Sequence, residues 1–177
     1  HARPDLRLEL LRGNVDTRLR RLAEGELDAI LLACAGLERL GLGNRITQVL
    51  DLELSLPAVG QGVIGVECRE DDATSRSALV ALHHEPSFVR LKAERAFAQT
   101  LGGSCHSPIA AHASLDRESL VVHGFVGSPD GHEVYRDVER GSPKDTEALG
   151  RRLAARMQAA GAGALLDRLR DEAAATS

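Results

Sequence analysis

Strand-like runs of apolar residues between residues 109 and 140 predict an antiparallel sheet. The strand-like runs are residues 109–115, 120–127 and 132–140. Turn-forming residues at 116–118 and 128–131 separate these runs. Because such short connections join strands that run in opposite directions, we expect the three runs to pair within one antiparallel sheet.

Apolar residues at helical spacing predict a cover for this sheet. A helix is expected to begin at Pro143, and its apolar stripe is formed by Leu149, Leu153 and Met157. A glycine-rich stretch then separates it from a last helix over residues 165–170. We interpret the stripe as packing against one face of the sheet, without a chemical role.

Two further helices are predicted before the sheet. Asp71 or Asp72 is suited to cap a helix that runs through His83. Pro86 then opens a second helix that reaches Thr100, because proline is favoured in the first helical turn.

The first part of the chain shows an alternation of strand-like and helical patterns, which is typical of an α/β sheet. In the run of residues 28–33, every residue after Asp28 is apolar, as in a strand buried on both faces. The remaining strand-like runs are residues 6–10, 50–54 and 63–68, and helices are predicted over residues 15–23 and 34–40.

Composition and charge narrow the range of partners and compartments. The 177 residues, 43% of them apolar, suffice for one large or two small domains with packed cores. A net charge of −4 and the lack of a long apolar run argue against nucleic-acid and membrane partners. Three widely spaced cysteines suit a reducing compartment better than a disulfide framework. We therefore predict a cytoplasmic protein.

The most distinctive chemical candidate is Cys105, which lies between a glycine pair and a proline. Gly102 and Gly103 permit unusual backbone angles, and Pro108 restrains the residue before it, so the segment predicts a shaped loop between a helix and a strand. A thiol there is open to a reagent, although a small apolar filler beneath a turn is the alternative.

A second candidate site lies around the predicted helix over residues 15–23. Arg12 precedes its start and Arg18 lies one to two turns inside, so both guanidinium groups are able to face the helix N-terminus, where anions are favoured. A solvated basic helix face is the alternative, and we apply it to Arg20 and Arg21. No spacing among the cysteines and histidines matches a zinc-ligand pattern, so no metal site is predicted.

These features together resemble the porphobilinogen deaminase (hydroxymethylbilane synthase) family. The resemblance rests on residues 12–19, residues 56–62 and the loop at 101–109, which occur in the family's order and at its spacing, and it extends from about Arg3 to about Glu172. It implies that Cys105 carries a dipyrromethane cofactor through a thioether. It also implies that Arg12 and Arg18 bind acidic side chains of the cofactor and substrate.

The resemblance implies further binding residues and a domain plan. Arg39, Asn14 and Gln61 are expected to bind the substrate porphobilinogen. Residues 1–60 are expected to be part of a periplasmic-binding-protein-like α/β domain, residues 61–80 a crossover segment, and residues 85–177 an α+β domain that attaches the cofactor. Glu94 either faces the cofactor loop or forms a surface ion pair with Arg95.

The implied activity is the joining of four porphobilinogen molecules into hydroxymethylbilane, with release of ammonia, by a monomeric enzyme of tetrapyrrole biosynthesis. No aspartate here matches the family's catalytic aspartate, so no catalytic residue is named, and we expect an inactive fragment that lacks the family's first domain and the start of its second. The alternatives are a non-enzymatic module that binds carboxylates and a thiol-redox protein, the latter weakened by the absence of a resolving cysteine.

Overall fold

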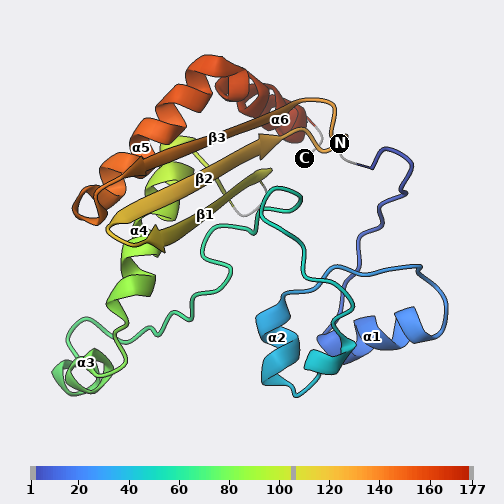
Figure 1. Ribbon diagram of the computed structural model, residues 1–177, viewed down its shortest axis with the longest axis horizontal. Helices are drawn as coiled ribbons and strands as arrows, with labels where there is room; N and C mark the ends of the chain where they lie inside the picture. The colour runs from blue at the N-terminus through green and yellow to red at the C-terminus, as the bar shows by residue number, and fades with distance from the viewer. Residues whose placement is uncertain (1–2, 105–106, 176–177) are drawn as a thin grey trace. The chain divides into compact units, whose positions relative to one another are not determined.

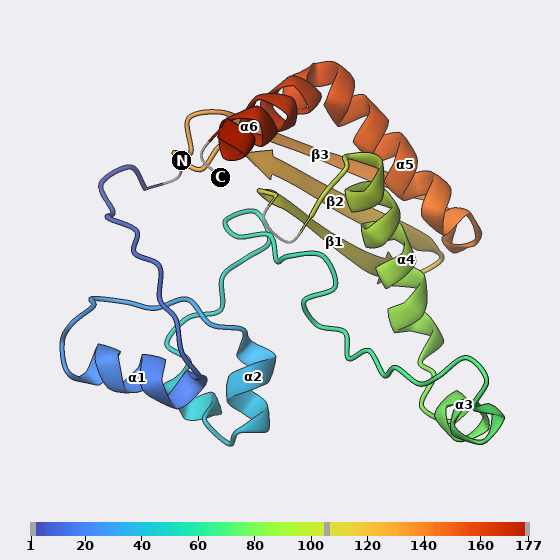
Figure 2. The same ribbon diagram turned by 180° about the vertical axis from the view of Figure 1, so that it is seen from behind.

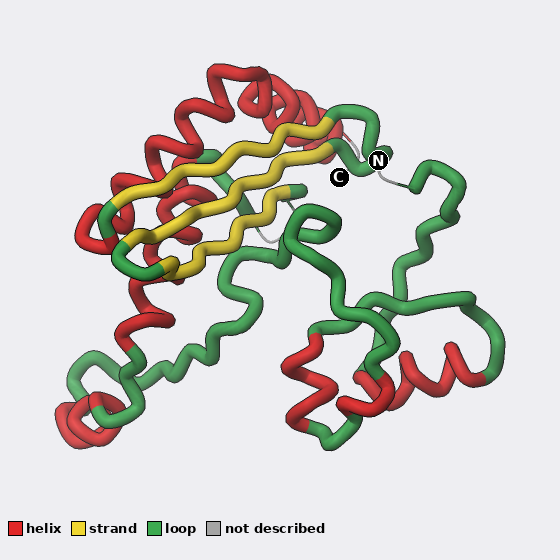
Figure 3. The backbone as a smooth tube through the Cα atoms, viewed as in Figure 1, coloured by secondary structure: helices red, strands yellow, loops and turns green. Residues whose placement is uncertain are grey.

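A computed structural model describes residues 3–104 and 107–175 of the chain (Figure 1). Contacts divide the chain into two compact units, one that ends at Leu54 and one that begins at Ser55. Figure 3 shows that loops dominate the first unit, whereas helices and strands dominate the second. We describe each unit by itself.

The first unit contains the two predicted helices and one short turn of helix. Helix α1 spans Val15–Ala23, α2 spans Cys34–Arg39, and the 3-10 helix η1 spans Gly43–Arg45. Asn14 caps α1, since its side-chain oxygen accepts a hydrogen bond from the Thr17 N–H at 2.9 Å. The two helices are therefore confirmed close to their predicted bounds.

The strands predicted upstream of α3 are wrong for the described chain. Residues 6–10, 28–33, 50–54 and 63–68 form loops and turns, and no described strand pairs with them. Several of their apolar side chains are also exposed, by 84% at Leu8 and 73% at Leu31. A strand needs hydrogen-bond partners on a neighbouring strand. The apolar pattern alone does not show whether such a neighbouring strand is present.

The second unit contains the predicted three-stranded antiparallel sheet and its helices. Helices precede and follow the strands in the order α3 (Ala73–Val80), α4 (Glu85–Thr100), β1 (Ile109–Asp116), β2 (Ser119–Gly127), β3 (Val134–Gly141), η2 (Pro143–Asp145), α5 (Thr146–Met157), η3 (Gln158–Ala162) and α6 (Gly163–Ala175). The strand order is β1-β2-β3. The predicted fold class is confirmed for this unit.

Helices α4 and α5 cover one face of the sheet, as Figure 2 shows from the helix side. Ala111 and Ala113 of β1 and Val122 of β2 point to this face and are buried. The core includes Phe97 of α4 and Leu153 of α5, and the predicted stripe of α5 is confirmed as core. The opposite sheet face, turned toward the viewer in Figure 1, carries no described helix.

Arg156 joins α5 to β3 through two carboxylates. Its Nε donates to Asp137 Oδ2 at 2.5 Å and its Nη1 donates to Glu139 Oε2 at 2.6 Å. The hydrogen bonds from Arg156 hold the pKa of both carboxyl groups below the ordinary range, while partial burial opposes the shift. These interactions attach the helix to the outer strand of the sheet.

Replacing Arg156 with Leu is expected to lower the free energy of unfolding by about 1 kcal/mol at neutral pH, since the network is partly exposed. Because both folded pKa values are depressed, the stabilisation is complete above the ordinary carboxyl pKa of about 4 and is lost as the pH falls below that value and through the lower pKa values of the folded protein. Urea unfolding of both proteins between pH 7 and pH 3 measures the difference.

Arg151→Leu provides the control for this experiment, because Arg151 is exposed on the same helix. Its effect should be small and nearly independent of pH. A stability difference for Arg156→Leu that stays constant down to pH 3 would contradict the assignment.

Among the described residues, no helix combines the length and the apolar character needed to cross a membrane.

Candidate functional site

The loop that contains Cys105 begins at a tightly closed helix end. Leu101 ends α4, and Gly102 follows with a φ of +66°. The Gly103 N–H donates to the Ala98 carbonyl at 2.8 Å and the Gly102 N–H donates to the Gln99 carbonyl at 3.0 Å. This pair of bonds is the Schellman motif, which requires a left-handed residue at Gly102. The unusual backbone angle predicted for the glycine pair is thus found at Gly102.

The residues on either side of Cys105 and His106 are held to each other. The Ser104 N–H donates to the Ser107 hydroxyl at 2.9 Å, and the Ser107 N–H donates to the Ser104 carbonyl at 3.1 Å. The carbonyl of Pro108 then accepts from the Gly127 N–H of β2 at 3.2 Å. Cys105 itself lies outside the described residues. The structure therefore defines the two ends of its loop, both fixed to regular elements.

Glu94 has a role that neither sequence interpretation anticipated. Its side chain is buried, with 7% of the residue exposed, and its two oxygens accept backbone hydrogen bonds at 2.8 Å from Gly60 and from Ala113. Arg95 beside it is exposed. The suggested surface ion pair is therefore wrong. Instead, one carboxylate joins the turn at residues 58–62 to the outer edge of β1.

A charged residue within an apolar helix face was the available signal for this contact. Ala93, Ala96 and Phe97 surround Glu94 in sequence and are all buried. A carboxylate is rarely buried without partners. The pattern therefore indicated a buried carboxylate with hydrogen-bond donors, although it could not identify Gly60 and Ala113 as the donors.

In the first unit, the side chain of Arg18 folds back onto the turn that follows Arg12. The Arg18 Nε donates to the Gly13 carbonyl at 2.8 Å. This contact brings the Arg18 guanidinium against the loop before α1, while Arg12 is exposed. The side-chain oxygen of Asn14 is occupied by the helix cap.

The arginines of the first unit fall into two groups. Arg20 forms an ion pair with Glu24 at 2.9 Å, and Arg21 forms one with Glu26 at 2.6 Å. Within the described chain, Arg12, Arg18 and Arg39 have no such carboxylate partner; Arg39 lies exposed at the end of α2. These three guanidinium groups can therefore accept carboxylates from a ligand.

Gln61 belongs to the second unit, where it follows the glycine that contacts Glu94. Gly60 has a φ of +70°, and the Gln61 side chain is exposed. Val59 packs against the hydrophobic core. The turn is thus fixed at Val59 and Gly60, so the following residue, Gln61, occupies a defined position on the surface.

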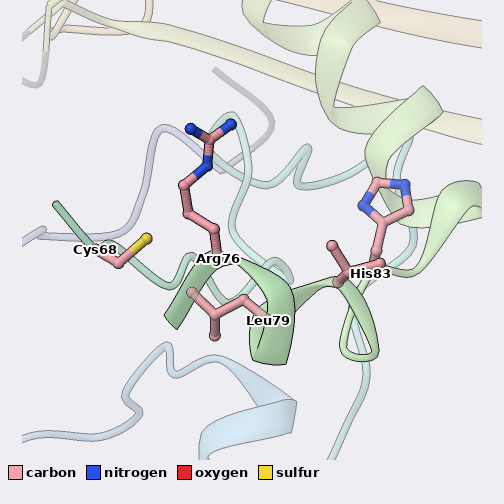
Figure 4. A pocket seen from close by; sticks show the side chains of 5 residues that line it. Cys68, Arg76, Leu79 and His83 are labelled. Carbon is pink, nitrogen blue, oxygen red and sulfur yellow. The ribbon is translucent and has the colours of Figure 1, made fainter. Parts of the chain in front are cut away.

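A separate hollow of about 460 Å³ lies beside α3, lined by Cys68, Arg76, Leu79, Val80 and His83 (Figure 4). Cys68 is half-exposed in a loop, so its predicted place within a strand is wrong. None of the residues nominated for binding lines this hollow. We therefore do not assign the binding site to it.

Two family models match the chain in succession. Residues 1–77 match "Porphobilinogen deaminase, dipyromethane cofactor binding domain", and residues 88–159 match "Porphobilinogen deaminase, C-terminal domain". The chain belongs to the porphobilinogen deaminase family. A curated porphobilinogen deaminase from Trichlorobacter lovleyi is 46% identical over 166 residues, which cover 94% of this chain and 53% of the relative. The chain thus spans about half the length of that family member.

Proposed function

We propose that the protein containing this chain is a hydroxymethylbilane synthase, which joins four porphobilinogen molecules with release of ammonia. The family match and the dipyrromethane-binding description of residues 1–77 support this function. The observation that carries it is the loop flanking Cys105, whose ends are fixed by the Schellman motif and by the contacts between Ser104 and Ser107.

Cys105 is proposed as the attachment point of the cofactor. The residues just before it, from Gly102 to Ser104, are exposed. Formation of a thioether requires an accessible thiolate, whereas a thiol buried under a turn is inert. A covalently held dipyrromethane would supply a fixed primer on which the product is built.

Arg12, Arg18 and Arg39 are proposed to bind the acidic side chains of the cofactor and the substrate. Guanidinium groups bind carboxylates through two parallel hydrogen bonds. Because the chain provides these arginines with no carboxylate of its own among the described residues, binding a ligand does not require breaking an existing ion pair. Asn14 and Gln61 are proposed as further substrate contacts.

The remaining proposals concern the whole protein. We propose that it acts as a cytoplasmic monomer on a small-molecule substrate, without nucleic-acid or membrane partners. No acidic residue of this chain is assigned as the proton donor or acceptor in the condensation. The isolated 177-residue chain is accordingly expected not to consume porphobilinogen.

The test is intact-mass analysis and peptide mapping of the protein produced from its native gene. Wild-type protein and Cys68→Ser, the matched control, should carry a dipyrromethane-sized adduct on the peptide containing Cys105. Cys105→Ser should carry none and should lose nearly all activity, about a thousandfold or more, because the primer on which the product is built can no longer be attached.

Two results would count against these proposals, the first against the attachment point and the second against the enzyme. An unmodified Cys105 in the active wild-type protein would remove it as the attachment point. Carboxylate binding by a protein that carries no adduct and consumes no porphobilinogen would favour the alternative of an anion-binding module, which the same unpaired arginines could serve.

A further inference from the structure

Two histidines lie directly opposite each other on the sheet face that carries no described helix. The strand register pairs His112 of β1 with His123 of β2. Their neighbours Ala111, Ala113 and Val122 point to the helix-covered face and are buried, so both imidazoles lie on the other face. Both histidines are half-buried.

The ladder fixes the spacing of this pair. The Ala113 N–H donates to Glu94 and therefore points away from β2. Because hydrogen-bonded and non-hydrogen-bonded pairs alternate along antiparallel strands, His112 and His123 form a hydrogen-bonded pair with Cα atoms about 5.5 Å apart. Side chains on one face at this spacing reach each other.

We propose that His112 and His123 together bind a divalent transition-metal ion of the nickel, copper or zinc class. Two nitrogen ligands of one tetrahedral ion lie about 3.3 Å apart at metal–nitrogen distances of about 2.0 Å, a separation that opposed imidazoles can reach. Water or a donor from another molecule completes the coordination.

The surroundings select for such an ion and against harder cations. The pair's neighbours on the same face are Ala110, Ser114, Val121, Phe125 and Val138. None of them supplies a carboxylate, whereas magnesium and calcium need several oxygen ligands. The two guanidinium groups on the face are engaged: Arg136 lies over the Phe125 ring at 4.9 Å from its centroid, and Arg140 pairs with Asp116 at 2.8 Å.

The other described histidines lie outside the three strands. His83 contacts Glu85 at 2.7 Å, and His84 contacts the Ser87 hydroxyl at 2.9 Å. His132 is exposed in the turn before β3. Of the histidines the structure describes, His112 and His123 are thus the two that share a sheet face as direct partners.

The experiment is a titration of the ¹⁵N-labelled 177-residue chain with nickel chloride, followed by amide and imidazole NMR signals. Nickel should broaden the signals of His112 and His123 first, together with amides of β1 and β2 around them. His112→Gln and His123→Gln should each weaken binding about a hundredfold, because two-point attachment is lost. His132→Gln should leave the affinity unchanged.

The double variant tests whether both imidazoles bind the same ion. If one ion bridges the two imidazoles, His112→Gln and His123→Gln combined should lose little more affinity than either alone. Wild-type affinity in either single variant, or first broadening elsewhere in the chain, would overturn the proposal. The map of broadened signals in the wild-type chain answers the question even if a variant folds poorly.

Discussion

Glu94→Gln is expected to lower the free energy of unfolding of the second unit by about 2–3 kcal/mol, because a buried carboxylate that accepts two N–H groups loses an acceptor. The amide of glutamine offers only one acceptor oxygen. Its NH₂ group is a donor and cannot accept a hydrogen bond from the other backbone N–H. One of the two backbone groups, at Gly60 or at Ala113, is left without its hydrogen bond.

The same substitution should release the turn at residues 58–62. Hydrogen exchange at Gly60 and Ala113 should accelerate beyond what the fall in global stability explains. Limited proteolysis should cut within residues 55–62 first. Urea unfolding gives the stability, and Glu118→Gln in the exposed turn between β1 and β2 is the matched control, with an effect below about 0.5 kcal/mol. Unchanged exchange at both amides would refute the contact.

Gly150→Ala should destabilise the second unit by about 3 kcal/mol or more, through overpacking between α4 and α5. A Cβ at position 150 would lie 2.2 Å from the Ala93 carbonyl oxygen and 2.9 Å from the Phe97 nitrogen. Both atoms belong to the backbone of α4, so relief requires the helices to separate. The consequence extends to the loop of Cys105, which begins at the end of α4.

Thermal and urea unfolding measure this effect, and Gly163→Ala at the start of α6 is the control. A Cβ there would make ordinary contacts, 3.5 Å or more from Gln158. Since alanine favours the helix, that variant should be neutral or more stable by up to about 1 kcal/mol. Equal stability of the two variants would mean that α4 and α5 are less closely packed than described.

The sequence predicted the sheet of the second unit well because its paired strands are close together along the chain. Short turns join β1 to β2 and β2 to β3, so each strand finds its neighbour locally. Helix α1 was equally easy to predict from the sequence, since its cap at Asn14 and its end near Gly25 are local signals. In each case, a few consecutive residues contained the information.

The predictions of strands over residues 6–10 and 28–33 were wrong because no local signal identifies their pairing partners. Their pattern describes side chains suited to a sheet, but pairing depends on a second segment that the pattern does not name. The contact of Glu94 with Gly60, 34 residues away, and the opposition of His112 and His123 likewise depend on register and packing. Of the predicted site, Cys105 lies outside the described residues, and the roles of the arginines stay predictions.

The same side chains that join elements of the second unit also limit how it can aggregate. At one border of the sheet, Glu94 occupies the outward N–H of Ala113; at the other, Arg156 Nη2 donates to the Val138 carbonyl at 3.0 Å. Exposed strand borders recruit strands from other molecules and start amyloid-like growth. With a backbone group engaged on each border, a fourth strand cannot add there without displacing an ionic side chain. Polymerisation of the folded protein through strand addition is thereby opposed at both edge strands, β1 and β3.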